Sequence, residues 1–117
     1  MPNDKDSIRL QHMLDAARKA THYIEGRSRS DLDKDEMLTL ALIRLLEIIG
    51  EAARNVTVET RQRHPSIPWK SIAGTRDRLI HGYFDVDMDI VWTILTEDLP
   101  RLIADLEKTA LPGTSSV

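Results

Sequence analysis

Five side chains that could do chemistry on a phosphate lie within eight residues of this 117-residue chain: Arg76, Asp77, Arg78, His81 and Tyr83. Arginine presents a rigid fork of donors that matches a phosphate and always stays charged. Histidine can both accept and give a proton near pH 7. Such a pair could cleave RNA without a metal, because one side chain moves protons and the other stabilises charge on the phosphoryl oxygens. We expect His81 to do the acid–base work and Arg76 to hold the phosphate.

The charge distribution places this cluster on a positive segment of an acidic chain. The chain has 16 basic and 19 acidic residues, a net charge of −3, yet residues 60–83 contain five basic residues and one acidic residue. Such a segment would direct an anion to one place, although a solvated helix face has the same pattern. His81 placed against a helix dipole, with Arg76 and Arg78 in solvent, would also explain the residues. The net charge argues mildly against a general nucleic-acid binder.

The spacing within the cluster limits how a site could form. Residues five apart on a regular helix are separated by about 140°, so Arg76 and His81 do not share a face. Asp77 and His81 do share one, at i and i+4, so Asp77 could orient the imidazole. Either the helix loosens at Gly82, or two copies of the chain assemble the site around a twofold axis.

Helical periodicity dominates the elements that must position these residues. We expect a first helix over about 7–25 and a long second helix that starts at Asp31 or Asp33 and ends at Asn55. The second helix is apolar on more than one face, which predicts both a central position and an interface. A turn with one short helix over 56–64 and a helix from Ser66–Pro68 to about His81 should follow. The last helix should start near Asp87 and either kink at Pro100 or restart with Asp98 as its cap.

These patterns predict an all-α fold, an antiparallel bundle of four to five helices. The length fits one domain over residues 1–110, with a flexible C-terminal tail over 111–117. The chain has no cysteine, which excludes disulfides and thiolate chemistry. We see no secretory signal and no membrane-spanning run, so we expect a cytoplasmic protein. His22 and Glu25 have a metal-binding spacing, but two ligands do not make a metal site.

The motif segment resembles the signature of HepT-like proteins in the HEPN superfamily. The residues that carry the resemblance are Ile67-Pro68-Trp69, the run from Ile72 to Asp87 with its Arg-x4-His-x-Tyr motif, and the stretch from Leu46 to Ala53. The likeness spans about residues 7–108. It implies a HEPN-like helical fold, with Arg76 and His81 as the catalytic pair and Asp77 in the polar supporting position. Arg78 would add a second supporting charge on the same segment.

The resemblance also implies a function. The function implied is that of a metal-independent endoribonuclease that acts on RNA without a cofactor. Such a protein would be the toxin of a prokaryotic toxin–antitoxin pair, with an active cleft at a homodimer interface. Tyr83 matches the tyrosine that a minimal nucleotidyltransferase antitoxin adenylates in some members. Two alternatives stay open: a non-catalytic module that binds a nucleotide or the nucleotidyltransferase, and a purely structural dimeric bundle.

Overall fold

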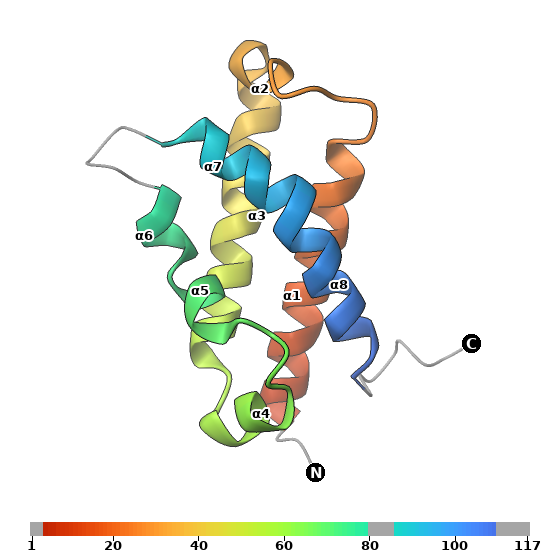
Figure 1. Cartoon of the computed structure of the whole chain (residues 1–117), viewed down its shortest axis with the longest axis vertical. Coiled ribbons are helices and arrows are strands. Elements are labelled where there is room, and N and C mark those ends of the chain that lie inside the picture. Colours follow the sequence, from red (N-terminus) through yellow and green to blue (C-terminus); the bar gives the residue numbers. More distant parts are fainter. Residues whose placement is uncertain (1–3, 80–85, 110–117) are drawn as a thin grey trace.

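A computed structural model describes residues 4–79 and 86–109, and the secondary structure within these ranges is helical, without a β-strand (Figure 1). The all-α expectation is therefore confirmed. No helix in the described ranges is both long and apolar enough to cross a membrane. The helices are α1 (Asp4–Tyr23), α2 (Asp31–Lys34), α3 (Glu36–Asn55), α4 (Val58–Arg63), α5 (Trp69–Ala73), α6 (Thr75–Leu79), α7 (Met88–Thr93), the π-helical η1 (Ile94–Asp98) and α8 (Leu99–Glu107).

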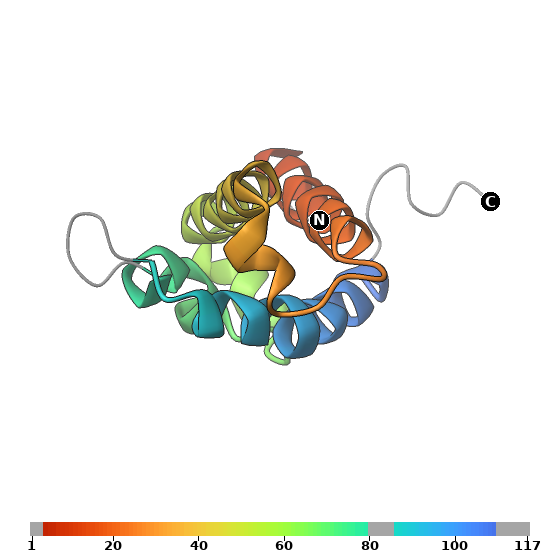
Figure 2. The same cartoon turned by 90° about the horizontal axis from the view of Figure 1, so that it is seen from above.

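The helices form two layers, with the apolar core between them. The antiparallel helices α1 and α3 make one layer, and α5 to α8 run across the other (Figure 2). Apolar residues three and four apart give each long helix one buried stripe. The side chains that are almost completely buried come from both layers: Met13 and Leu14 of α1, Leu42 and Leu46 of α3, Leu79 of α6, Val91 and Leu95 of α7 and η1, and Leu106 of α8.

The expected second helix is divided at Asp35, so a single helix from Asp31 or Asp33 to Asn55 was wrong. Asp35 has extended backbone angles, and its side chain accepts a hydrogen bond from the Leu38 amide at 3.0 Å. Aspartate offers this competing bond readily, which favours a cap over a helix interior. The preceding turn α2 stays helical on its own and buries Leu32 in the core.

The helix expected from Ser66–Pro68 to about His81 is also divided in the described part. Helix α5 begins at Trp69 without a side-chain cap, and α5 and α6 meet at Gly74. The Trp69 indole is buried and donates from Nε1 to the His64 carbonyl at 3.0 Å, which fixes the entry into α5. Trp69 is thus a core residue. The expected end at His81 lies outside the described residues.

The C-terminal helix starts as predicted and passes Pro100 in an unexpected way. The Asp87 carboxylate caps α7 by accepting from the amides of Asp89 and Ile90, at 3.0 and 3.1 Å. The chain does not restart at Asp98, because its side chain makes no cap hydrogen bond and η1 continues directly into α8. Proline has no N–H and its ring crowds the preceding turn, and a π turn widens the helix there.

Candidate functional site

Helix α6 carries three of the five predicted site residues: Arg76, Asp77 and Arg78. The side chains of Asp77 and Arg78 are exposed, and the side chain of Arg76 lies outside the described part of the chain. His81 and Tyr83 lie outside the described residues altogether. The arrangement of Arg76, Asp77 and His81 therefore stays a prediction.

The core fixes the position of α6 from both ends. Thr75 is buried and donates from Oγ1 to the Ser71 carbonyl at 3.3 Å, and the Leu79 side chain is only 1% exposed. The Asp87 amide donates to the Leu79 carbonyl at 2.9 Å, so the chain before residue 80 is tied to the chain after residue 85. The exposed residues of α6 consequently stand on a short but well-anchored helix.

Helix α5, which leads into α6, lies very close to α3 at Gly50. A Cβ atom at this position would be 3.2 Å from the carbonyl oxygen of Ile72, closer than side chains ordinarily approach a backbone oxygen. A glycine in the middle of a helix costs about 0.5–1 kcal/mol relative to alanine. This cost is offset by a closer packing of α5 on α3, which sets the distance of α6 from the core.

Arg78 is held between α5 and η1. Its Nη1 atom donates to the Ser71 hydroxyl at 3.2 Å and lies 3.9 Å from a carboxylate oxygen of Asp98. Both side chains of this ion pair are substantially exposed, and such pairs contribute at most about 1 kcal/mol. The guanidinium is therefore oriented by its neighbours but can exchange the Asp98 contact for a phosphate at little cost.

A hollow of about 460 Å³ opens beside Arg78, between α3, α5, α6, η1 and α8. Its walls are apolar toward the core, and its rim carries the charged residues Arg78, Asp98, Arg101 and Asp105. An apolar floor with a few polar groups suits a planar ligand with a charged end. The lining residues are Leu46, Ile49, Ser66, Pro68, Ser71, Ile72, Thr75, Arg78, Ile94, Asp98, Leu99, Arg101, Leu102 and Asp105.

Sequence reasoning did not find Arg101 and Asp105 as site residues. They lie more than 20 positions after Arg78, in the acidic C-terminal part, and only the packing of α8 brings them to the hollow. Their spacing of four on one helix was the available signal, and it indicates no more than a shared face.

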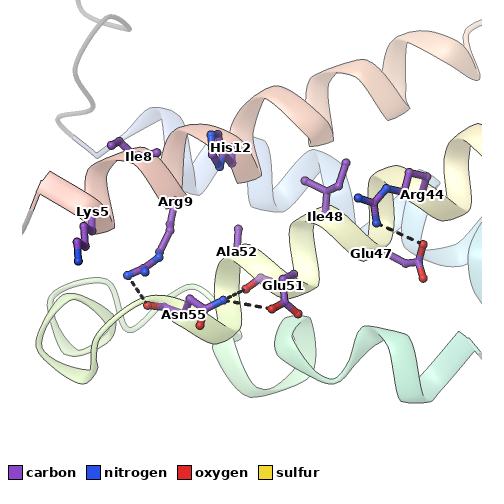
Figure 3. A pocket seen from close by; sticks show the side chains of 10 residues that line it. All are labelled: Lys5, Ile8, Arg9, His12, Arg44, Glu47, Ile48, Glu51, Ala52 and Asn55. Atoms are coloured by element: carbon purple, nitrogen blue, oxygen red, sulfur yellow. Dashed lines mark hydrogen bonds and ion pairs between the residues drawn. The ribbon is translucent and has the colours of Figure 1, made fainter.

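The other candidate ligands stay apart from this site. His22 Nδ1 lies 3.4 Å from Glu25 Oε1, but the described residues contain no group of three or more His, Asp or Glu side chains that could hold a metal ion. His12 is exposed on α1, in a different hollow that also contains Arg44 (Figure 3).

Fold and site together define a small all-α protein with a basic motif helix beside an amphipathic hollow. The family of such proteins is identified by comparison: a model of the family described as "Ribonuclease HepT-like" matches residues 13–109. The chain belongs to this HepT-like family.

Curated relatives agree with this assignment. The chain is 44% identical over 93 residues to "Putative RNase TTE0752" from Caldanaerobacter subterraneus, a match that covers 80% of this chain and 83% of that protein. It is 46% identical over 74 residues to "Probable ribonuclease HepT" from Thermococcus cleftensis, covering 63% of this chain and 67% of the relative. It is 35% identical over 98 residues to "Putative RNase MJ1380" from Methanocaldococcus jannaschii, covering 84% and 90%. No solved structure matches significantly.

Proposed function

We propose that this protein is an endoribonuclease that cleaves RNA phosphodiester bonds without a metal ion, at a site centred on α6. The observation that carries the proposal is the anchored motif helix α6 on the positive segment of a HepT-like chain. The relatives whose names call them ribonucleases support the reaction class.

The reaction proposed is an internal transfer at phosphorus. The ribose 2′-oxygen forms a bond to phosphorus while the bond to the 5′-oxygen of the next nucleotide breaks, leaving a 2′,3′-cyclic phosphate and a 5′-hydroxyl. His81 moves the protons between the 2′-hydroxyl and the leaving oxygen. Arg76 stabilises the charge that develops on the phosphoryl oxygens, and Asp77, one helical turn before His81, orients the imidazole.

The hollow beside α6 provides a place for the RNA next to the cleaved bond. An apolar floor formed by side chains such as Pro68 and Ile72 suits the face of a base, because burying the apolar surface of both is favourable. Arg78 and Arg101 at the rim would contact the neighbouring phosphates. The hollow therefore binds substrate, and the chemical step takes place on the adjoining residues of the motif.

The biological role proposed is that of a toxin controlled by an antitoxin. A cognate minimal nucleotidyltransferase would adenylate Tyr83, and the active cleft would form between the two copies of a homodimer. An anionic adduct two residues from His81 fills the cleft and repels RNA, as phosphorylation does at other sites. The family resemblance of the Arg-x4-His-x-Tyr motif supports this role.

RNA cleavage by the purified protein in excess EDTA tests the proposal. We expect cleavage with 2′,3′-cyclic phosphate ends, and a loss of about 10²–10⁴-fold in rate for His81→Ala. Arg76→Lys should not restore activity, because lysine lacks the planar fork. His12→Ala is the matched control, since His12 is exposed on α1, away from α6.

The intact mass of each sample makes a negative result interpretable. Protein that carries extra adenylate masses and leaves RNA intact is the silenced toxin, and removing the adducts should then release the activity. Folded protein of unmodified mass that leaves RNA intact contradicts the proposed function.

The net charge of −3 favours a second candidate, a non-catalytic module that binds a nucleotide or the nucleotidyltransferase. Affinity for bulk RNA comes from many phosphate contacts and falls steeply with salt. Weak, salt-independent RNA binding together with tight binding of the partner enzyme would select this alternative.

A further inference from the structure

Asp105 places a carboxylate without a partner in the hollow beside Arg78. It lines the hollow from α8, and the residue is partly buried. In the part of the chain that the structure describes, its carboxylate accepts no hydrogen bond and forms no ion pair. A carboxylate that loses part of its hydration is costly unless a donor replaces the water. The hollow therefore contains an acceptor that is available to a ligand.

The position of Asp105 in α8 adds to this cost. Asp105 lies in the last turn of α8, which ends at Glu107 and has no basic residue in that turn. The free carbonyl groups at a helix C-terminus disfavour a negative side chain. Glu107, in the same turn, is compensated by Arg18, whose Nη2 atom lies 2.6 Å from its carboxylate. Asp105 has no such cation, so the stability of the helix does not explain its charge, and residues of this kind are typical of functional sites.

The rest of the hollow suits one nucleotide of an RNA strand. Pro68 and Ile72 offer apolar surface to the face of a base, and Arg78 and Arg101 carry positive charge at the rim for phosphates. The volume of about 460 Å³ is in the range of sites that bind small molecules. Helices α5 and α8, which contribute the two sides, belong to the same layer of the fold (Figure 2). Asp105 would then face the edge of the bound base.

The chemistry of a carboxylate distinguishes guanine from the other three bases. An ionised carboxylate only accepts hydrogen bonds, and it has two oxygens side by side. Guanine has two donors side by side, N1–H and the N2 amino group, on its Watson–Crick edge. Adenine and cytosine have one amino group beside an acceptor nitrogen, and uracil has one N–H between two carbonyl oxygens. With those bases a carboxylate oxygen would face a lone pair, which disfavours binding.

Asp98, the other carboxylate of the hollow, is less available to a base. One of its oxygens lies 3.9 Å from Nη1 of Arg78, and its side chain is 52% exposed. Asp98 and Asp105 are seven residues apart, which corresponds to about 10 Å along a helix axis, so one base edge contacts only one of them. Asp98 orients Arg78, and Asp105 remains for the base.

We propose that Asp105 determines the specificity of the hollow, and that it binds a guanine of single-stranded RNA through N1–H and the N2 amino group. The inference rests on the proposed function, because it specifies the RNA that the hollow takes. Asp105 performs no chemical step. It selects which nucleotide lies next to the residues of the motif, so that cleavage occurs at a fixed distance from a guanine.

Binding of short RNA analogues tests the inference without cleavage. The probes are the trinucleotides U-G-U, U-A-U, U-C-U and U-U-U with 2′-O-methyl riboses, because methylation blocks the attacking oxygen. Isothermal titration calorimetry with the full chain should show U-G-U binding about 10-fold more tightly than the others, as a bidentate contact to one base predicts. Inosine in place of guanine keeps N1–H but lacks the amino group, and its affinity should be intermediate.

Asp105→Asn is the most informative variant, because it changes the hydrogen-bonding pattern with little change of shape. The amide has one acceptor and one donor, which matches the amino group and ring nitrogen of adenine. We expect the preference for U-G-U over U-A-U to fall about 10-fold and U-A-U to bind at least as tightly as U-G-U. Glu97→Gln, a matched loss of one exposed negative charge outside the hollow, should keep the guanine preference. Circular dichroism shows that both variants are folded.

Cleavage of RNA provides a second measurement. Unmodified oligouridines with one guanine, adenine or inosine at the centre should be cut at a fixed position relative to guanine and more slowly in the other two. Asp105→Asn should move the preference in kcat/KM from the guanine to the adenine substrate. A residue that only supported the fold would lower all the rates together and leave their ratio unchanged.

The outcomes separate this inference from the proposed function. A preference for U-G-U that Asp105→Asn shifts to U-A-U supports the guanine site, even if no RNA is cleaved. Equal binding of all the trinucleotides, no binding of U-G-U at millimolar concentration, or an unchanged guanine preference in Asp105→Asn overturns it. RNA cleavage by a chain that binds all the trinucleotides equally would leave the proposed function in place and refute the guanine site alone.

Discussion

Replacing Asp6 should destabilise the fold more than replacing any exposed carboxylate. The Asp6 side chain is 0% exposed and accepts three hydrogen bonds from the start of α4: from the Thr57 amide at 3.1 Å, the Thr57 hydroxyl at 2.5 Å and the Thr60 hydroxyl at 2.6 Å. Arg9 Nη1 lies 3.6 Å from the carboxylate. The contact joins the first turn of α1 to a helix more than 50 residues later.

The number and type of these bonds set the size of the effect. A hydrogen bond to a charged group contributes about 1.5–3 kcal/mol, and an unsatisfied buried donor costs about 1–3 kcal/mol. The full sum is not lost, because the Thr57 hydroxyl also lies 3.4 Å from the Thr60 hydroxyl and can turn to it. We expect Asp6→Ala to lower the free energy of unfolding by about 3 kcal/mol and the melting temperature by about 12 °C. Asp6→Asn, which can still accept, should cost about 2 kcal/mol.

The pH dependence of this loss is a sharper test than its size. Burial raises the pKa of Asp6, but hydrogen bonds from Thr57 and Thr60, together with Arg9, outweigh it and lower the pKa below the ordinary aspartate value. A carboxylate whose pKa is lowered by folding stabilises the protein at a pH above its unfolded pKa of about 3.9, and this contribution fades as pH falls through the folded pKa. The difference between the native chain and Asp6→Asn should therefore be constant from pH 7 to 5 and shrink below pH 4.

Urea denaturation followed by circular dichroism, at a fixed protein concentration, measures this difference. Glu97→Gln is the control, because Glu97 is exposed in the other layer and should change stability by less than about 0.5 kcal/mol. A native chain and an Asp6→Asn variant of equal stability at pH 7 would refute the reasoning, and so would a difference that grows toward acid pH.

Three further changes probe the scaffold and the rim of the hollow. Gly50→Ala should change the free energy of unfolding by less than about 1 kcal/mol, because the gain in helix propensity offsets the close contact with the Ile72 carbonyl. The rate of RNA cleavage should nevertheless fall several-fold, because α5 moves outward. Urea denaturation measures the first effect and initial cleavage rates measure the second. Trp69→Phe should cost about 1 kcal/mol, seen in thermal unfolding, since it removes one of the two hydrogen bonds that the His64 carbonyl accepts, the other coming from the Ile67 amide. Arg78→Ala should weaken RNA binding and lower its salt dependence by about one phosphate contact, while Arg78→Lys keeps the salt dependence, as titrations at several salt concentrations would show.

The periodicity of apolar residues predicted the long helices well, because one buried face leaves a clear pattern in the sequence. Leu10, Leu14 and Ala17 mark α1, and Leu99, Leu102 and Leu106 mark α8. These positions alternate by three and four in the printed sequence, and the described structure buries all of them. The helix that buries its apolar residues on one side is the easiest to predict.

The helix breaks could not be predicted in the same way. Asp31, Asp33 and Asp35 are all able to cap a helix, and the structure uses Asp35 to cap α3, with Leu32 of α2 buried in the core and its carbonyl accepting from the Thr39 hydroxyl at 2.6 Å. A glycine such as Gly74 is tolerated inside a helix, so its role as the junction of α5 and α6 depends on how α5 packs against α3. Local sequence permits each break, and contacts distant in sequence select among them.

The candidate site was likewise predictable only where its residues are close together in the sequence. Arg76, Asp77 and Arg78 were predicted as site residues because they are neighbours in the sequence and lie on one positive segment, and their role stays a prediction. The hollow beside Arg78 was not predicted, because η1 and α8 bring Asp98 and Arg101 to α5 and α6 only in the folded chain. A motif in one segment is visible in the sequence, whereas a hollow lined by five helices becomes visible only when their packing is known.

Helix α3 connects these observations, because each of its sides has a different task. Leu46 and Ile49 face the core, and Gly50 lets α5 approach and so positions α6. A helix that only completed a bundle would need one apolar side, and polar residues would suffice elsewhere. Gly50 goes beyond that requirement, because its lack of a Cβ atom lets the Ile72 carbonyl approach and so sets where α6 stands.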